Sequence, residues 1–208
     1  MSFHNPIIGL VLCGGKSSRM GQDKGTLRHQ DKYWANHVQQ CFDQLGIPSY
    51  LSINHTQKEN YEACGLDRLI LDQVAIDGPM RGLLSAHQVF PRADIFVLAC
   101  DMINMDIPTV SQLLDIRTQI IHADVYTFLH KQRPEPCCAI YTTSGLQKLT
   151  NEIQAGGLKH YSLQKFIKRL HPVYIPAPTL DYAFRNYNSP KDLTNRSLTL
   201  QTIPGNFL

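Results

Sequence analysis

The sequence lacks the marks of a membrane, secreted or zinc-binding protein. Its apolar runs fall well short of the roughly 18 residues that cross a bilayer, and no Lys or Arg precedes Lys16 to start a signal peptide. Its six cysteines form no C-x-x-C pair, and its nine histidines include no H-E-x-x-H. We therefore expect a soluble cytoplasmic protein, with neither membrane nor nucleic acid as a partner, whose cysteines are mostly buried, reduced thiols.

The sequence also lacks a large excess of either positive or negative charge. The net charge is +3, with 18% charged and 43% hydrophobic residues in 208 positions. This composition excludes a disordered chain and is too weakly basic for a nucleic-acid footprint, whereas it suits an anionic small substrate. The length predicts a single domain over residues 1–208, with a core of about residues 6–198 and a tail at 199–208.

Short apolar runs alternate with helical periodicity along the chain. We expect strands at Ile7–Cys13, Ser49–Asn54, Arg68–Leu71, Asp94–Cys100, Ala123–Phe128, Cys137–Tyr141 and Val173–Ile175. Helices are expected at Tyr33–Leu45, Pro79–Phe90, Thr109–Arg117, Ser144–Gln154 and Tyr161–Leu170. Strands that are apolar on both faces are typical of parallel sheets, so the fold class is α/β: a Rossmann-like, doubly wound, mostly parallel sheet flanked by helices in a single domain.

Ligands of such sheets bind beyond the carboxyl ends of the strands. The first predicted strand runs into Gly14 and Gly15, and the next three end at Asn54, Asp72 and Asp101. A glycine-rich turn, an amide and two acids are therefore expected to meet at one edge of the sheet.

The turn after the first strand carries three cations: Lys16, Arg19 and Lys24. It is not a Walker A loop, because Leu10 stands where that motif needs glycine, and it is not a G-x-G-x-x-G fingerprint either. Cations beside glycines whose N–H groups are accessible indicate phosphate binding. Within this loop Asp23 is either a local ion-pair partner or a loop cap.

The polar residues at the other strand ends have two interpretations each. Asp101 is either a cap or a Mg²⁺ ligand, because Mg²⁺ takes one or two carboxylates and otherwise water and phosphate oxygens. Asp72 and Asn54 are likewise caps or ligand contacts. The helix start in "DGPMRG", with Gly78, Pro79, Arg81 and Gly82, is either a plain turn or an anion site. In "FRNYNSPKDL", Asn186 and Asn188 would face one side of a strand, or would only cap the next helix.

Taken in order, these segments resemble one family. "LCGGKSSRMGQDKGTL" is similar to the L-x-G-G-x(3)-R-M-G-x-D-K signature of the molybdenum cofactor guanylyltransferases. The similarity continues through Asp72, "GPMRGLLSA", "ACD" at Asp101 and "NYNSP", so it spans roughly Ile7 to Leu193. The first motif is long and specific, and the later ones agree with it in order and spacing.

The resemblance implies transfer of GMP from GTP to the terminal phosphate of molybdopterin, with Mg²⁺ as cofactor and pyrophosphate as second product. It implies that Leu12, Cys13, Gly14 and Gly15 line the nucleotide pocket, that Asn54 and Asp72 recognise the nucleotide, and that Lys24 contacts the phosphates. Asp101 would bind Mg²⁺ and GTP, Arg19 would belong to the phosphate loop, and Asn186 and Asn188 would lie near the cofactor phosphate or metal. Gly78, Pro79, Arg81 and Gly82 would form the acceptor or phosphate side, and proteins that load molybdoenzymes are further expected partners.

Three alternatives stay open. A cytidylyltransferase of the same group would make the cytosine form of the cofactor, although Gly14-Gly15 favours guanine because the cytosine enzymes resemble L-A-A-G there. A sugar-1-phosphate nucleotidyltransferase shares the opening loop. A non-catalytic nucleotide-binding or accessory protein would not need Lys24 and Asp101 together. Cys13, Met80, Arg81 and the stretch "CCAIY" depart from the family pattern. None of these departures removes a chemical role, and they leave the pterin side open.

Overall fold

The computed structural model describes residues 5–14, 23–29, 31–157, 162–177, 183–184 and 187. A seven-stranded sheet forms its centre, in the spatial order β5-β4-β1-β6-β8-β7-β9. The strands are β1 (Ile7–Leu12), β4 (Ser49–Ile53), β5 (Leu69–Leu71), β6 (Asp94–Ala99), β7 (Val125–His130), β8 (Arg133–Tyr141) and β9 (Pro172–Pro176). A strand thus lies at each of the seven predicted positions, and the α/β class is confirmed.

The sheet is parallel except at β8. Strands β5, β4, β1 and β6 run parallel to one another, as do β7 and β9. Strand β8 lies antiparallel between β6 and β7. It follows β7 through a tight turn at Lys131 and Gln132, which both adopt positive φ. The predicted mostly parallel sheet is therefore correct, and this hairpin is the departure from it.

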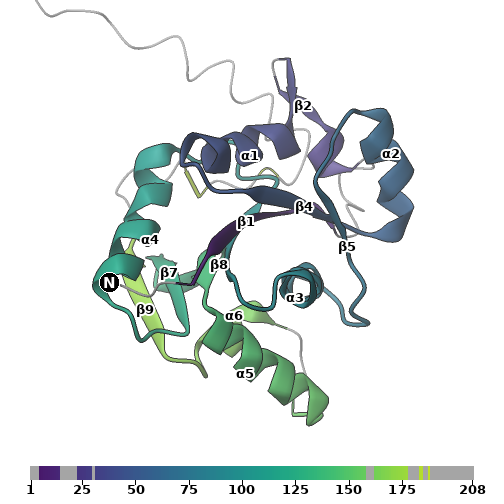
Figure 1. Cartoon of the computed structure of the whole chain (residues 1–208). Coiled ribbons are helices and arrows are strands. Elements are labelled where there is room, and N and C mark those ends of the chain that lie inside the picture. The colour runs from purple at the N-terminus through teal and green to yellow at the C-terminus, as the bar shows by residue number, and fades with distance from the viewer. Residues whose placement is uncertain are drawn as a thin grey trace, which may run out of the picture.

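Helices cover both faces of the sheet (Figure 1). On one face lie α1 (Trp34–Gln44), α2 (Lys58–Ala63) and α4 (Ile107–Gln119), and on the other α3 (Pro79–Val89), α5 (Thr143–Gln154) and α6 (Leu163–Ile167). Side-chain caps set several starts: Asp106 accepts from the backbone N–H of Thr109 at 2.8 Å, so α4 begins before the predicted Thr109. Ser162 caps α6, which is shorter than the predicted Tyr161–Leu170.

Some short elements were not predicted. These are the 3₁₀ turns η1 (Lys24–Thr26) and η2 (His55–Gln57), the helix α2, and the small hairpin of β2 (Arg28–His29) and β3 (Lys32–Tyr33). Each is too short or too polar to give a periodic signal. Two of them, η1 and η2, nevertheless lie at the edge of the sheet where ligands are expected.

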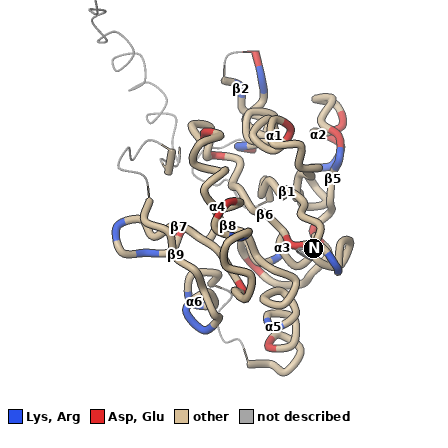
Figure 2. Tube along the Cα trace, turned by 60° about the vertical axis from the view of Figure 1, so that its left-hand side comes forward, with Lys and Arg blue, Asp and Glu red and all other residues tan. Residues whose placement is uncertain are grey.

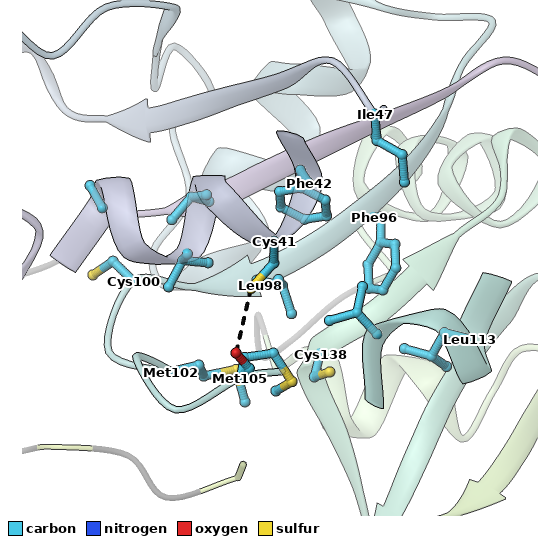
Figure 3. Packing of buried hydrophobic residues seen from close by; sticks show 14 of the residues in the cluster. Cys41, Phe42, Ile47, Phe96, Leu98, Cys100, Met102, Met105, Leu113 and Cys138 are labelled. Atoms are coloured by element: carbon cyan, nitrogen blue, oxygen red, sulfur yellow. Dashed lines mark hydrogen bonds between the residues drawn. The ribbon is translucent and has the colours of Figure 1, made fainter. Parts of the chain in front are cut away.

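Each face of the sheet buries its own hydrophobic core. In the core below α1 and α4, Phe42 packs edge-on against Phe96 with ring centroids 5.4 Å apart. Figure 3 shows this pair beside Cys41, whose thiol donates to the carbonyl of Met105 at 3.5 Å. The second core lies between the sheet and α3, α5 and α6. Burial on both faces explains why the strands read as continuous apolar runs.

A buried ion pair fixes the end of the sheet opposite to the carboxyl ends of the parallel strands. Asp94, the first residue of β6, accepts from Arg117 Nε at 2.9 Å and from Arg117 Nη2 at 2.7 Å. The same carboxylate accepts from the backbone N–H of Thr143 at 2.9 Å. Asp94 and Arg117 are only 4% and 7% exposed, so this pair ties α4, α5 and β6 together inside the protein.

Charged residues are spread over separate outer elements. Figure 2 shows Lys and Arg on the β2–β3 hairpin, on α6 and on the turn between β7 and β8, with acidic residues between them. Among the residues that the structure describes, every helix is too short or too polar to cross a lipid bilayer.

Candidate functional site

The carboxyl ends of four parallel strands gather the polar residues singled out from the sequence. Strands β1, β4, β5 and β6 run in one direction, so the residues that follow them reach the same edge of the sheet. That edge holds, in strand order, Cys13 and Gly14, Asn54, Asp72, and Asp101. The structure thus brings these residues together.

Two adjoining cavities open at this edge. The smaller, which we call the Lys24 cavity, has a volume of about 310 Å³ and is lined by Leu12, Cys13, Gly14, Lys24, Gly78, Pro79, Ala99, Cys100, Asp101 and Cys137. The larger, the Asp72 cavity, has a volume of about 780 Å³ and is lined by Gly14, Asn54, His55, Thr56, Asp72, Asp77, Gly78 and Arg81. Because Gly14 and Gly78 line both, an extended ligand can occupy the two at once.

A lysine and an aspartate face each other in the Lys24 cavity. Lys24 Nζ donates to Asp101 Oδ2 at 2.7 Å, although the two residues are 77 positions apart. Their side chains are only 16% and 14% exposed. A largely buried cation and carboxylate in one cavity can bind a phosphate together with its metal ion. The cation attracts phosphate oxygens, and the carboxylate can hold a divalent metal.

The carboxylate of Asp72 is held between Ser52 and Gly14. The Ser52 hydroxyl donates to Asp72 Oδ1 at 2.7 Å, and a Cβ at Gly14 would lie 2.6 Å from Asp72 Oδ2. Only glycine leaves room for this approach. Burial raises the pKa of Asp72, and it outweighs the lowering by the Ser52 hydrogen bond and by the nearby charges of Arg81 and His55.

Asn54 caps the turn that forms one wall of the Asp72 cavity. Its side-chain oxygen accepts from the backbone N–H of Gln57 at 3.1 Å, and Gln57 Oε1 accepts from the backbone N–H of Asn54 at 2.8 Å. This reciprocal pair is a capping box. Of the two interpretations of Asn54, the capping role is observed, and it places the residue in the cavity wall.

The start of α3 contributes to both cavities. Gly78 precedes the helix with φ of 78°, a conformation that favours glycine, and Pro79 occupies the first turn. Arg81 lies in the wall of the Asp72 cavity, where its Nη2 donates to Asp77 Oδ1 at 3.0 Å and its Nε donates to the carbonyl of Ile76. Gly82 lies behind the cavities, where it packs on Ser52 and Leu12.

Several residues from the sequence analysis lie outside the described part of the chain. These are Gly15, Lys16 and Arg19 of the opening loop, and Asn186 and Asn188 near the carboxyl end. Tyr187, between the two asparagines, is described and buried, and its hydroxyl accepts from Asn104 Nδ2 at 2.8 Å.

Two further groups lie near the site: Asp23, which has two interpretations from the sequence, and Cys137, which has no role from the sequence. Asp23 turns out to be a loop cap, since its carboxylate accepts from the backbone N–H of Gly25 at 2.9 Å. Cys137, in the middle of β8, is partly buried and lines the Lys24 cavity together with Asp101. Burial raises the pKa of Cys137 to about 12, so it is a neutral wall residue and not a nucleophile. The antiparallel direction of β8, which the sequence did not indicate, is what brings Cys137 here.

Comparison with known proteins agrees with this geometry. The family model described as "MobA-like NTP transferase domain" matches residues 9–173. The chain is 29% identical over 187 residues to the molybdenum cofactor biosynthesis bifunctional protein of Synechocystis sp.; the match covers 90% of this chain and 52% of that protein, so the chain spans about half of that relative. It is also 29% identical over 198 residues to the molybdenum cofactor guanylyltransferase of Ectopseudomonas mendocina, with 93% of each chain covered.

A solved structure shares the fold. The chain superposes with a TM-score of 0.71 and 22% identity on molybdopterin-guanine dinucleotide biosynthesis protein A from Archaeoglobus fulgidus, covering 91% of this chain and 95% of that one. The residues that match the family model include every residue that lines the Lys24 and Asp72 cavities. The chain belongs to the family of the MobA-like NTP transferase domain and is a nucleotidyltransferase.

Proposed function

We propose that this enzyme transfers GMP from GTP to the terminal phosphate of molybdopterin, releasing pyrophosphate and forming the guanine dinucleotide cofactor. The proposal is supported by the named relatives and, above all, by one geometric observation. Lys24 and Asp101 meet at 2.7 Å in a cavity that adjoins a second, larger one. A cation and a metal-binding acid are thereby available to one triphosphate, whose nucleoside can extend into the neighbouring cavity.

In this proposal the Asp72 cavity takes the guanosine and the Lys24 cavity takes the phosphates. Asn54 and Asp72 lie in the wall of the larger cavity, where an amide and a carboxylate can hydrogen-bond to base or ribose. Leu12, Cys13 and Gly14 form the floor of the Lys24 cavity, and Gly14 also lines the Asp72 cavity. The backbone N–H groups of Cys13 and Gly14 both donate to the carbonyl of Ser52, each at 2.9 Å, which fixes that floor.

The chemistry needs little more than positioning and charge neutralisation. A terminal phosphate oxygen of molybdopterin attacks the α-phosphorus of GTP, the bond from that phosphorus to the bridging oxygen breaks, and pyrophosphate leaves with its electron pair. The nucleophile is already an anion, so no strong general base is required. Lys24 would leave Asp101 to donate to the phosphate oxygens, where charge builds up during the transfer.

Asp101 would then be free to hold Mg²⁺. One carboxylate completed by phosphate and water oxygens is an ordinary Mg²⁺ site, so the donor set fits the metal. The ion would supply charge neutralisation between two polyanions. Arg19, Asn186 and Asn188 are proposed to complete the phosphate and acceptor side, together with Gly78, Pro79 and Arg81.

Pyrophosphate release tests the proposal. Purified enzyme is mixed with GTP, MgCl₂ and molybdopterin, and pyrophosphate is measured. We expect Lys24→Ala and Asp101→Asn each to lower kcat about 10²-fold or more, a usual loss for one partner of transition-state charge. Lys58→Ala and Asp67→Asn are matched controls, because Lys58 and Asp67 lie on the surface outside both cavities. Near-normal rates in both site variants would refute this site, and binding of GTP without release would favour an accessory protein.

The base is tested separately by competition. GTP and CTP are each added with MgCl₂, and the thermal unfolding midpoint is recorded, because a ligand that binds only the folded state raises it. We expect protection by GTP. Protection by CTP alone would replace the guanylyltransferase by a cytidylyltransferase, and turnover with a sugar 1-phosphate in place of molybdopterin would change the acceptor.

A further inference from the structure

Three side-chain and backbone groups converge on the carboxylate of Asp23, the residue directly before Lys24. Asp23 Oδ1 accepts from the backbone N–H of Gly25 and from the Tyr61 hydroxyl, each at 2.9 Å. Asp23 Oδ2 accepts from Gln57 Nε2. These hydrogen bonds fix the residues directly before and after Lys24. Two of the donors come from η2 and α2, which are distant in sequence.

Gln57 connects this turn to the floor and wall of the two cavities. The same Nε2 that donates to Asp23 also donates to the carbonyl of Cys13 at 3.1 Å. Its Oε1 accepts from the backbone N–H of Asn54 at 2.8 Å. One amide thus joins the end of β1, the Lys24 turn and the Asn54 turn.

Tyr61 is a rigid support for the turn. It is fully buried in α2, and its hydroxyl lies over Gly25, where a Cβ would be only 2.0 Å away. Burial raises the pKa of Tyr61, and the neighbouring carboxylate of Asp23 acts in the same direction. The phenol therefore stays neutral and keeps the proton that it donates.

We propose that Asp23, Gln57 and Tyr61 are positioning residues that hold the Lys24 turn so that its ammonium group lies beside Asp101. The inference rests on the proposed function, in which Lys24 stabilises the transferring phosphate. A lysine side chain has four flexible bonds, so its reach is useful only if its backbone is fixed. Here that fixation comes from side-chain hydrogen bonds and not from regular secondary structure, because η1 is only three residues long.

The pairing between positions 23 and 57 can be reversed. Asp23→Asn turns an amide N–H toward Gln57 Nε2, and Gln57→Glu places a second carboxylate against Asp23, so each single change removes the hydrogen bond. The two changes together restore a donor and an acceptor, and they keep the total charge. In every variant with the Gln57→Glu change, the Cys13 carbonyl still loses its donor. We therefore expect each single variant to lower kcat by about 10-fold to 100-fold, since small misplacement of a catalytic group has effects of this size, and the double variant to recover part of the loss.

A second comparison separates positioning from general stability. Tyr61→Phe removes only the hydroxyl and should lower kcat several-fold in the wild-type protein. In a Lys24→Ala background it should lower kcat no further, because the hydroxyl acts through Lys24. Tyr50→Phe is the control, since the Tyr50 ring packs on Phe90 away from both cavities. Equal losses in the two backgrounds, with the variants folded by thermal melting, would overturn the inference.

A readout without turnover keeps this inference distinct from the proposed function. The Lys24 ammonium, hydrogen-bonded to Asp101, should give a ¹H–¹⁵N signal at low temperature that is missing in Lys24→Ala. We expect this signal to be lost in Gln57→Glu and to return in the double variant. Its persistence in Gln57→Glu would contradict the network whichever substrate reacts, whereas failure of wild-type enzyme to release pyrophosphate from GTP would refute only the proposed function.

Discussion

At the scale of single residues, Asp72 lowers the stability of the fold in the cavity that is proposed to bind the nucleoside. Its carboxylate is partly buried, and burial raises its pKa above the ordinary 3.8. In the pH range between that value and the raised one, the folded state binds more protons than the unfolded state. Stability therefore falls as the pH rises through this range, and the ionised carboxylate destabilises the protein at neutral pH.

Replacing this carboxylate should stabilise the protein at the expense of activity. Asp72→Asn keeps an oxygen that can accept from the Ser52 hydroxyl, and it has no charge to bury. We expect a higher unfolding midpoint than wild type at pH 7.5, a smaller difference near pH 4, and weaker protection by GTP. Thermal melts between pH 4 and 8 measure both effects. A lower midpoint at neutral pH would show that the Asp72 charge stabilises the fold after all.

The role of a residue could be predicted where it depends on neighbours in the sequence, and not where it depends on residues that are distant in the sequence. Asp101 and Asp72 were found because an acid directly after an apolar run predicts a strand end. Asp23 kept two interpretations, because its partners Gln57 and Tyr61 belong to short elements without a periodic signal. Cys137 was placed correctly in a strand, but its position beside Asp101 follows from the direction of that strand, which apolar patterning does not encode.

At the scale of elements, the turn between β7 and β8 has a strained backbone. Lys131 and Gln132 have φ of 48° and 63°. Two-residue hairpin turns with positive φ at both positions usually contain Asn or Gly, and this one contains neither. The missing signal is the reason why the sequence predicted separate strands here and no hairpin.

Relieving this turn should raise stability. Gln132→Gly removes the Cβ that disfavours the left-handed conformation, and we expect a gain of about 1 kcal/mol in the free energy of unfolding. Gln132→Ala is the control, because it shortens the side chain and keeps the Cβ. Urea unfolding compares the two variants. If glycine and alanine unfold at the same urea concentration, the turn is not strained.

At the scale of the whole molecule, the cavities of the proposed site and the buried ion pair lie at opposite ends of the sheet. The cavities open at the carboxyl ends of β1, β4, β5 and β6, whereas the buried pair of Asp94 and Arg117 lies where β6 begins. The sequence predicted that polar residues gather at the first end, because ligand sites in α/β sheets follow a topological rule. The sequence did not predict the ion pair at the other end, because a buried pair between a strand and a helix leaves no local pattern.

Breaking the distant pair should therefore change stability alone. Arg117→Leu leaves Asp94 as a buried charge without its partner, and we expect a loss of about 3–5 kcal/mol in the free energy of unfolding. Arg169→Leu breaks a half-exposed pair with Glu152 and should cost less than about 1 kcal/mol. Urea unfolding gives both values. Below the melting temperature, kcat and KM for GTP should match wild type in both variants, and a large fall in kcat for folded Arg117→Leu would show that the two ends are coupled.

The direction of β8 also determines how the rim of the site can vary. Because β8 runs against β6, with Cys138 opposite Leu98, the turn at Lys131 and Gln132 projects past the end of β6 on the cavity side. Residues inserted in that turn would lengthen the rim beside Cys137 without shifting any strand pairing. The depth of the rim can thus be changed through the length of a single loop, while the strand pairing and the turn that carries Lys24 stay as they are.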